Sequence, residues 1–229
     1  MKLSVVIPAL NEATHIARLI THLQNNADER LQEIIVADGG SSDGTANIAE
    51  QAGAKVICLP VQSRAAQQNA GAAAATGDVL YFVHADVIPP ASYLDSIESA
   101  LRKGFEIGGC RQKFESKNFM LRINAWFTRF NLPFMRGGDQ TLFISAKVFQ
   151  QLGGFDEKYV IMEEYDLMRR ARKHYNFALL PCATVTSARK YNKNSWVRVQ
   201  LANARAVYQF KRGVDPRVIR DTYKNSLNW

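Results

Sequence analysis

The sequence predicts an α/β protein in which a mostly parallel central sheet is flanked by helices. In the first half of the chain, short apolar runs alternate with segments whose apolar residues recur with a helical period. Acidic or amide side chains follow three of these runs. The alternation is typical of βαβ units, in which helices cover both faces of the sheet and ligands bind beyond the carboxyl ends of the strands.

The predicted elements follow one another in pairs. Residues 3–9 (LSVVIPA) form a continuous apolar run that suits a strand buried on both faces, and residues 12–26 place their apolar side chains on one helical face. Gly53 is expected to end the second helix. The later strands are expected at 33–40, 55–61 and 78–86, and the later helices at 42–54 and 64–77.

Composition limits the class of protein. Of the 229 residues, 47% are hydrophobic and 22% are charged, which is typical of one large globular domain. The three cysteines form no CxxC pair, so neither a disulfide framework nor a zinc site is expected, and a reducing compartment is predicted. The amino terminus does not resemble a signal peptide, and no apolar run is long enough to span a bilayer. These features predict a cytoplasmic protein.

The net charge of +8 is concentrated at the carboxyl end of the chain. Residues 1–188 contain 19 basic and 19 acidic side chains, whereas residues 189–229 contain 10 basic and 2 acidic ones. A local excess of this kind favours an anionic partner for the basic segment rather than a nucleic-acid-binding protein. No zinc-finger, RRM or helix-turn-helix signature accompanies it.

Residues 195–213 predict an amphipathic helix within this basic segment. One interpretation is that its apolar face packs on the rest of the protein and its arginines are solvated. The other is that the arginines hold the protein at an anionic membrane surface or on an anionic acceptor. The expected apolar face carries Trp196, Val199, Asn203, Val207 and Phe210, and the opposite face carries Arg198, Arg205 and Arg212.

Ionisable side chains at the expected strand ends are the first candidates for a site. Asn11 with Glu12, then Asp38, then His84 with Asp86 follow successive strands, so all should lie along one edge of the sheet. A carboxylate at the end of a buried strand needs a partner, which can be a turn, a protein cation or a bound ligand. No GxGxxG or GxxxxGK[ST] loop is present to hold phosphates. A divalent cation on Asp86 would bridge a diphosphate instead.

Six motifs lie in order along nearly the whole chain: "VVIPALNE" at 5–12, "DGGSSDGT" at 38–45, "HAD" at 84–86, "GGDQTLF" at 137–143, "GGF" at 153–155 and "MEEYDL" at 162–167. Together they resemble those of family 2 inverting glycosyltransferases of the GT-A fold. The later stretches "SRAAQQNAGAAAATGDVLYFVHAD" and "TSARKY" are most similar to the bacterial arsenosugar-type glycosyltransferase subgroup.

The resemblance implies a GT-A catalytic domain over residues 1–188, followed by a basic helical extension over 189–229. Within the domain, residues 1–90 would bind the nucleotide sugar, with a UDP-sugar favoured, and 91–188 would bind a hydroxyl acceptor and carry the catalytic base. A divalent cation, Mn²⁺ or Mg²⁺, is implied on Asp86 and His84. The acceptor residues would be Gly138, Asp139 and Gln140. The donor residues would be Pro8, Ala9, Asn11, Glu12, Asp38, Gly40, Ser41, Asp43, Arg64, Asn69, His84, Ala85 and Asp86.

This sequence departs from the family pattern at two motifs. At His84-Ala85-Asp86, the carboxylate for the metal is kept, but an imidazole replaces its partner. His84 would then hydrogen-bond the ribose or ligate manganese, while the alternative is that it only terminates the strand. At Glu163-Glu164, the second glutamate matches the position of the family's base, and Asp166 is a possible substitute. The competing interpretation of these acids is a helix amino terminus, where the helix dipole favours them.

The chemistry that the resemblance implies explains why carboxylates are needed. Inversion at a sugar carbon requires a base that takes the proton of the attacking hydroxyl, which Glu164 would supply, and stabilisation of the departing diphosphate by the metal on Asp86. Two alternatives stay open. One is an inactive relative that binds nucleotides or glycans, and the other is a sugar nucleotidyltransferase, although the glycine-rich loop expected for that class is absent after the first strand.

Overall fold

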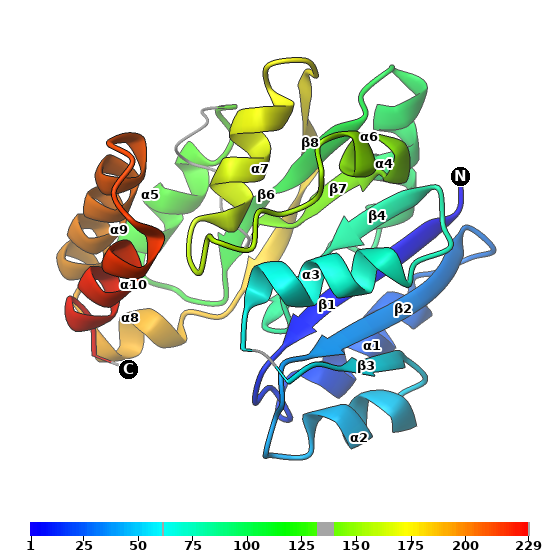
Figure 1. Ribbon diagram of the computed structural model, residues 1–229, viewed down its shortest axis with the longest axis horizontal. Coiled ribbons are helices and arrows are strands. Elements are labelled where there is room, and N and C mark those ends of the chain that lie inside the picture. The colour runs from blue at the N-terminus through cyan, green and yellow to red at the C-terminus, as the bar shows by residue number, and fades with distance from the viewer. Residues whose placement is uncertain (61, 132–139, 229) are drawn as a thin grey trace.

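The computed structural model describes residues 1–60, 62–131 and 140–228. Within this part of the chain one eight-stranded sheet forms the centre of the molecule, in the order β3-β2-β1-β4-β7-β6-β8-β5 (Figure 1). The strands are β1 (Leu3–Ala9), β2 (Leu31–Asp38), β3 (Lys55–Cys58), β4 (Val79–Phe82), β5 (Val87–Ile88), β6 (Ile107–Phe114), β7 (Leu142–Ser145) and β8 (Phe177–Thr186).

The predicted α/β fold class is confirmed, and the direction of the strands divides the sheet into two parts. Strands β3, β2, β1 and β4 are all parallel, as the alternating sequence pattern predicted. Strand β7 runs antiparallel to both β4 and β6, and β5 runs antiparallel to β8. The sheet as a whole is therefore mixed. The fourth strand ends at Phe82, earlier than predicted, because a turn begins at His84, whose carbonyl accepts a hydrogen bond from the Val87 amide.

Helices cover both faces of the sheet because alternate strand residues point to opposite sides. In β1, Val5 and Ile7 contribute to the core cluster under the first group of helices, whereas Val6 points to the second group. The first group is α1 (Ile16–Asn25), α2 (Thr45–Gln51) and α4 (Tyr93–Arg102), and the second is α3 (Arg64–Ala73), α6 (Ala146–Gln151) and α7 (Glu163–Ala171).

Helix α3 lies especially close to strand β1. A Cβ atom added at Gly71 would lie 2.4 Å from Cγ1 of Val6, which is fully buried. Only a glycine permits this approach at the observed distance. Gly53, which was predicted to stop the second helix, has a φ of +89°, and α2 ends at Gln51. The close packing of α3 brings the first turn of this helix to the carboxyl ends of the strands.

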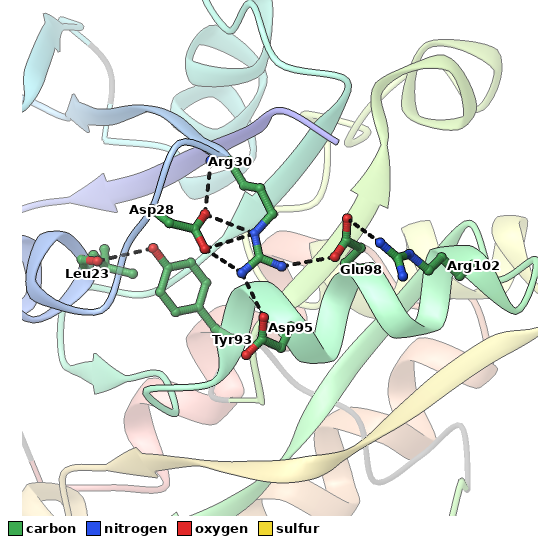
Figure 2. A network of polar contacts seen from close by, with 7 residues as sticks. All are labelled: Leu23, Asp28, Arg30, Tyr93, Asp95, Glu98 and Arg102. Carbon is green, nitrogen blue, oxygen red and sulfur yellow. Dashed lines mark hydrogen bonds and ion pairs between the residues drawn. The ribbon is translucent and has the colours of Figure 1, made fainter.

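An ion network lies at the opposite end of the strands, where β2 begins (Figure 2). The guanidinium of Arg30 contacts Asp28 at 2.5 Å, Asp95 at 2.7 Å and Glu98 at 3.0 Å, and so joins the start of β2 to α4. The hydrogen bonds from Arg30 lower the pKa of Asp28 to about 2. Tyr93 of α4 donates to the carbonyl of Leu23 nearby.

The remaining helices gather at one end of the molecule (Figure 1). They are α5 (Phe119–Phe127), α8 (Arg189–Lys193), α9 (Trp196–Lys211) and α10 (Pro216–Asn225). Helix α9 agrees with the predicted helix over 195–213, and its buried side packs on α10 and on Met162 before α7. No helix in the described ranges is both long and apolar enough to cross a membrane.

Candidate functional site

The site lies where the strand order reverses beside β1, at the carboxyl ends of the parallel strands. The loops that follow β1 and β2 are hydrogen-bonded to each other there. The amide of Asn11 donates to Ser41 Oγ at 2.8 Å, and the side-chain oxygen of Asn11 accepts from the Ser42 amide at 2.9 Å. The Glu12 amide donates to Thr45 Oγ1 at 2.9 Å. Hydrogen bonds thus join the two loops, some 30 residues apart in the sequence, into one cradle.

Asp38 and Asp43 shape the second of these loops. Asp38 is buried at the end of β2, where one carboxylate oxygen accepts from the amides of Gly40 and Ser41 at 3.1 and 2.8 Å, and the other accepts from the Ser41 hydroxyl. Gly40 has a φ of +85°, which this turn requires. Asp43 accepts from the amide of Ala13 at 3.1 Å. Both carboxylates therefore organise the loop through contacts within the protein.

Gln67 of α3 is a residue of this edge that the sequence analysis missed. Its buried amide donates to the carbonyls of Ala9 at 2.7 Å and Ala37 at 2.9 Å, and so ties the ends of β1 and β2 together. Pro8 and Ala9 lie in β1 opposite Ala37 and Asp38, as part of the same arrangement. A glutamine in a helical segment carries no distinguishing signal in the sequence, because its role arises from the packing of α3 across the strand ends.

Asp86 faces an arginine from the far end of the chain. Nη2 of Arg189 lies 3.2 Å from Asp86 Oδ2 and 3.0 Å from Glu12 Oε1. The second oxygen of Glu12, Oε2, is buried and has no hydrogen-bond partner among the described residues. The pairing of Val87 with Thr186 between β5 and β8 explains the contact, because it places the chain after β8 beside Asp86. Arg189 is a second residue that the sequence analysis missed.

His84, which follows the fourth strand, meets an acidic pair on α7. His84 Nε2 lies 3.0 Å from Glu164 Oε1, and Nη1 of Arg64 lies 3.2 Å from Glu163 Oε1. Burial favours protonation of both glutamates. Burial and the neighbouring Glu164 carboxylate raise the pKa of Glu163 to about 7. At Glu164, the hydrogen bond and charge of His84 outweigh burial and lower the pKa to about 2. Below pH 7 the pair therefore carries one negative charge, on Glu164.

Two predicted site residues are engaged elsewhere. Both oxygens of the buried Asp166 are bound by arginines, to Arg169 and Arg170 at 2.7 Å each. The amide of Asn69 donates to the Phe155 carbonyl at 2.9 Å and accepts from the Phe155 amide at 2.9 Å. Asp166 is therefore held by arginines of its own helix, and Asn69 holds the segment after α6 in place.

The expected acceptor residues are only partly described. Gly138 and Asp139 lie outside the described residues. Gln140 is buried two residues before Leu142, which pairs with Phe82 at the end of β4, so it lies at the same edge as His84. Ala85 is buried in the turn between His84 and Asp86.

The donor atoms for a divalent cation are few but suitable. In the described ranges no group of three His, Cys, Asp or Glu side chains is arranged to hold a metal ion. Asp86 and Glu12 nevertheless bring two carboxylates to one cationic nitrogen, and one oxygen of Glu12 is buried without a partner. Two carboxylates leave open coordination positions, which phosphate oxygens and water commonly fill on Mg²⁺ or Mn²⁺. The residues therefore fit a cation that binds together with a diphosphate.

Known proteins are similar to this chain in sequence and in fold. The family described as "Glycosyl transferase family 2" matches residues 4–155. The succinoglycan biosynthesis protein ExoA of Rhizobium meliloti (strain 1021) is 34% identical over 191 residues, which cover 74% of this chain and 57% of that protein. The chain thus spans less than two thirds of the length of this relative.

Two solved structures share the fold. Glucosyl-3-phosphoglycerate synthase from Mycobacterium tuberculosis, crystallised with Mn²⁺, UDP-glucose and phosphoglyceric acid, superposes with a TM-score of 0.66 at 20% identity, covering 93% of this chain and 80% of that one. S. aureus TarS in complex with UDP-GlcNAc gives a TM-score of 0.68 at 17% identity, covering 82% and 58%. At these identities the likeness concerns the fold.

Proposed function

Because the chain belongs to glycosyl transferase family 2, we propose that it transfers a sugar from a nucleotide-diphosphate sugar to a hydroxyl acceptor, with inversion at the sugar carbon. The observation that carries this proposal is the contact between His84 and Glu164, which brings a buried, ionised carboxylate to the edge where the cradle of the β1 and β2 loops lies. A UDP-sugar is the favoured donor, since the two similar structures contain UDP-sugars. We also propose membership of the bacterial arsenosugar-type subgroup, from the stretches at 63–86 and 186–191.

In this mechanism Glu164 is the general base. Its Oε1 is held by His84, which leaves Oε2 to accept the hydrogen bond of the acceptor hydroxyl. The carboxylate is ionised at neutral pH, as a base must be, but the hydrogen bond from His84 weakens its proton affinity. We therefore expect His84 to turn toward the donor in the reactive complex. Proton transfer from the hydroxyl to Glu164 then accompanies attack on the sugar carbon.

Asp86 and Glu12 are the residues that would hold Mn²⁺ or Mg²⁺. His84, which the resemblance implied as the second ligand, has Nε2 engaged by Glu164, so we propose Glu12 in its place. When bound with the donor, the ion would act as a Lewis acid on the charge that grows on the diphosphate. Asp86→Asn keeps the shape of the side chain but removes its charge. We expect it to abolish the Mn²⁺ dependence of UDP binding in calorimetry, and wild-type affinity in this variant with Mn²⁺ would remove the metal from the proposal.

The test of the base compares two carboxylates of the same helix. Glu164→Gln should retain UDP affinity within about twofold while lowering turnover at least about a hundredfold, the usual scale of general-base catalysis. Asp166→Asn, which breaks the contacts with Arg169 and Arg170, should mainly lower thermal stability. The opposite pattern would show that the base is misassigned. Absence of transfer from every sugar nucleotide in a panel, with and without Mn²⁺, would favour an inactive relative.

For the basic extension we propose attachment to an anionic membrane surface, with the protein on the cytoplasmic side. The apolar side chains that stand out from α9 are Val197, Leu201 and Tyr208, which share one side of the helix at 3.6 residues per turn. The ridge of Arg198, Arg205 and Arg212 runs beside this apolar stripe. The outward face thus carries apolar side chains as well as the three arginines that the sequence placed there. Such faces bind anionic lipid, with each basic residue contributing on the order of 1 kcal/mol.

Liposome sedimentation at low ionic strength tests this attachment. The protein should sediment with anionic but not neutral liposomes, and changing Arg198, Arg205 and Arg212 together to Glu should release it. The matched control reverses three exposed charges elsewhere on the protein. They are Arg102 at the end of α4, Lys103 directly after it, and Lys147 on α6. Equal sedimentation with both lipids, or none with either, would leave α9 as a structural cover for the catalytic domain.

A further inference from the structure

Arg189 occupies the position between two carboxylates where a cation would bind. One nitrogen, Nη2, contacts both Glu12 Oε1 at 3.0 Å and Asp86 Oδ2 at 3.2 Å. The mechanism above assigns no role to this arginine. Its position is set by long-range structure, because the antiparallel pairing of β5 with β8 brings residues more than a hundred positions apart to one point.

The charges at this point make the arginine a natural counter-ion. Without it, two carboxylates that are only 15% and 20% exposed would face each other with no cation between them. One guanidinium neutralises half of that charge, and Oε2 of Glu12 still lacks a hydrogen-bond partner among the described residues. The pair therefore attracts further positive charge, as a divalent ion would provide.

Exposure shows which of the three side chains is able to move. The side chain of Arg189 is 56% exposed, whereas both carboxylates are mostly buried. Arg189 is also the first residue of α8, a helix of only five residues. A long side chain that is half exposed reaches several positions at small cost, while Glu12 and Asp86 stay with their loops.

We propose that Arg189 is an exchangeable internal cation: it neutralises Glu12 and Asp86 before the donor binds, and it turns to the diphosphate when the metal takes its place between them. This inference rests on the proposed function and deepens it. A guanidinium forms strong bidentate hydrogen bonds to phosphate oxygens, so the exchange replaces two carboxylate contacts by contacts of at least equal strength. Arg189 then contributes to binding the donor and the departing diphosphate.

The exchange predicts that Arg189→Met changes two binding affinities in opposite directions, that for Mn²⁺ and that for UDP. Without nucleotide, the affinity for Mn²⁺, measured by the EPR signal of the free ion, should rise about tenfold because the competing charge is gone. With Mn²⁺ saturating, the affinity for UDP in calorimetry should fall about tenfold because the diphosphate loses a charged partner. Arg102→Met is the matched control, since it removes an exposed arginine at the end of α4 and should change neither affinity.

The outcomes separate this inference from the proposed function. If the wild type binds no UDP with Mn²⁺, the proposed function fails. If the wild type binds and Arg189→Met shows unchanged or weaker Mn²⁺ binding, or unchanged UDP binding, Arg189 is only a tether for α8 and the exchange is refuted. Arg189→Lys, which keeps the charge, should hold Mn²⁺ affinity near that of the wild type. Arg189→Gln, which also removes the charge, takes the place of the methionine variant if that protein does not fold, with the same expected shifts.

Discussion

Glu163 gives the sharpest prediction about pH, because the free energy of unfolding of the protein depends strongly on whether this buried side chain is neutral or charged. Burial and the Glu164 carboxylate raise its pKa to about 7, whereas an unfolded glutamate titrates near 4.5. A carboxyl group with a raised pKa contributes stability that is complete below the unfolded pKa and is lost as the pH rises through the folded one. Wild-type stability should therefore fall between about pH 5 and pH 8.5.

Glu163→Gln removes this titration and keeps nearly the same shape. From the two pKa values, the wild type should lose roughly 2–3 kcal/mol relative to the variant between pH 5 and pH 8.5, at about 1.4 kcal/mol per unit. Urea unfolding of both proteins at several pH values measures the difference. Glu164 stays ionised throughout this range because its pKa is about 2, and comparison with the wild type cancels the titration of groups distant from Glu163.

A control variant and the shape of the stability curves test this assignment of the Glu163 pKa. Glu50→Gln alters an exposed carboxylate on α2 and corrects for the loss of one acidic group. If the stability curves of the wild type and Glu163→Gln stay parallel from pH 5 to pH 8.5, burial and the Glu164 charge do not control Glu163. The assignment of a single charge to the pair below pH 7 would then be wrong.

Two further predictions concern the packing that positions the site. Arg30→Met breaks the network in Figure 2 and leaves three acidic groups without their shared cation, so thermal unfolding should begin about 3 °C lower, with UDP affinity unchanged. Gly71→Ala gains about 1 kcal/mol of helix propensity but places a methyl group 2.4 Å from Val6, where overpacking costs ~1–3 kcal/mol. The free energy of unfolding measured in urea should therefore be lower in the variant than in the wild type. Adding Val6→Ala should restore most of the loss, and a stable single variant would contradict the close approach.

The parallel half of the sheet was predictable because its information is local. Each buried run in the first half of the chain is apolar along its length, and each helix that follows repeats its apolar side chains with the helical period. The end of β4 was not predictable in this way, because the apolar run continues through Val83 while the backbone turns at His84. The antiparallel course of β7 was not predicted, since a strand of only four residues carries little periodicity.

The site was predictable to the extent that it depends on strand ends. Glu12, Asp38 and Asp86 were expected along one edge, and the structure places them there. The sequence left open whether Asp38 serves a turn or a ligand, and the hydrogen bonds of the loop show that it holds the turn. Arg189 and Gln67 were missed because their partners are set by β8 and by the crossing of α3, and neither contact leaves a pattern in nearby residues.

The hydrogen bonds between the loops after β1 and β2 also determine how substitutions there combine. Asn11 contacts Ser41 and Ser42 across 30 or more positions of the chain, and it holds a φ of +55° to do so. The loops are therefore already ordered, so the binding free energy of a ligand between them is not reduced by the entropic cost of ordering them. Changes at Asn11 and Ser41 should act on the same contacts, so their effects on affinity should be strongly non-additive. Exchange of either loop between relatives is thus expected to succeed only when both loops are transferred together.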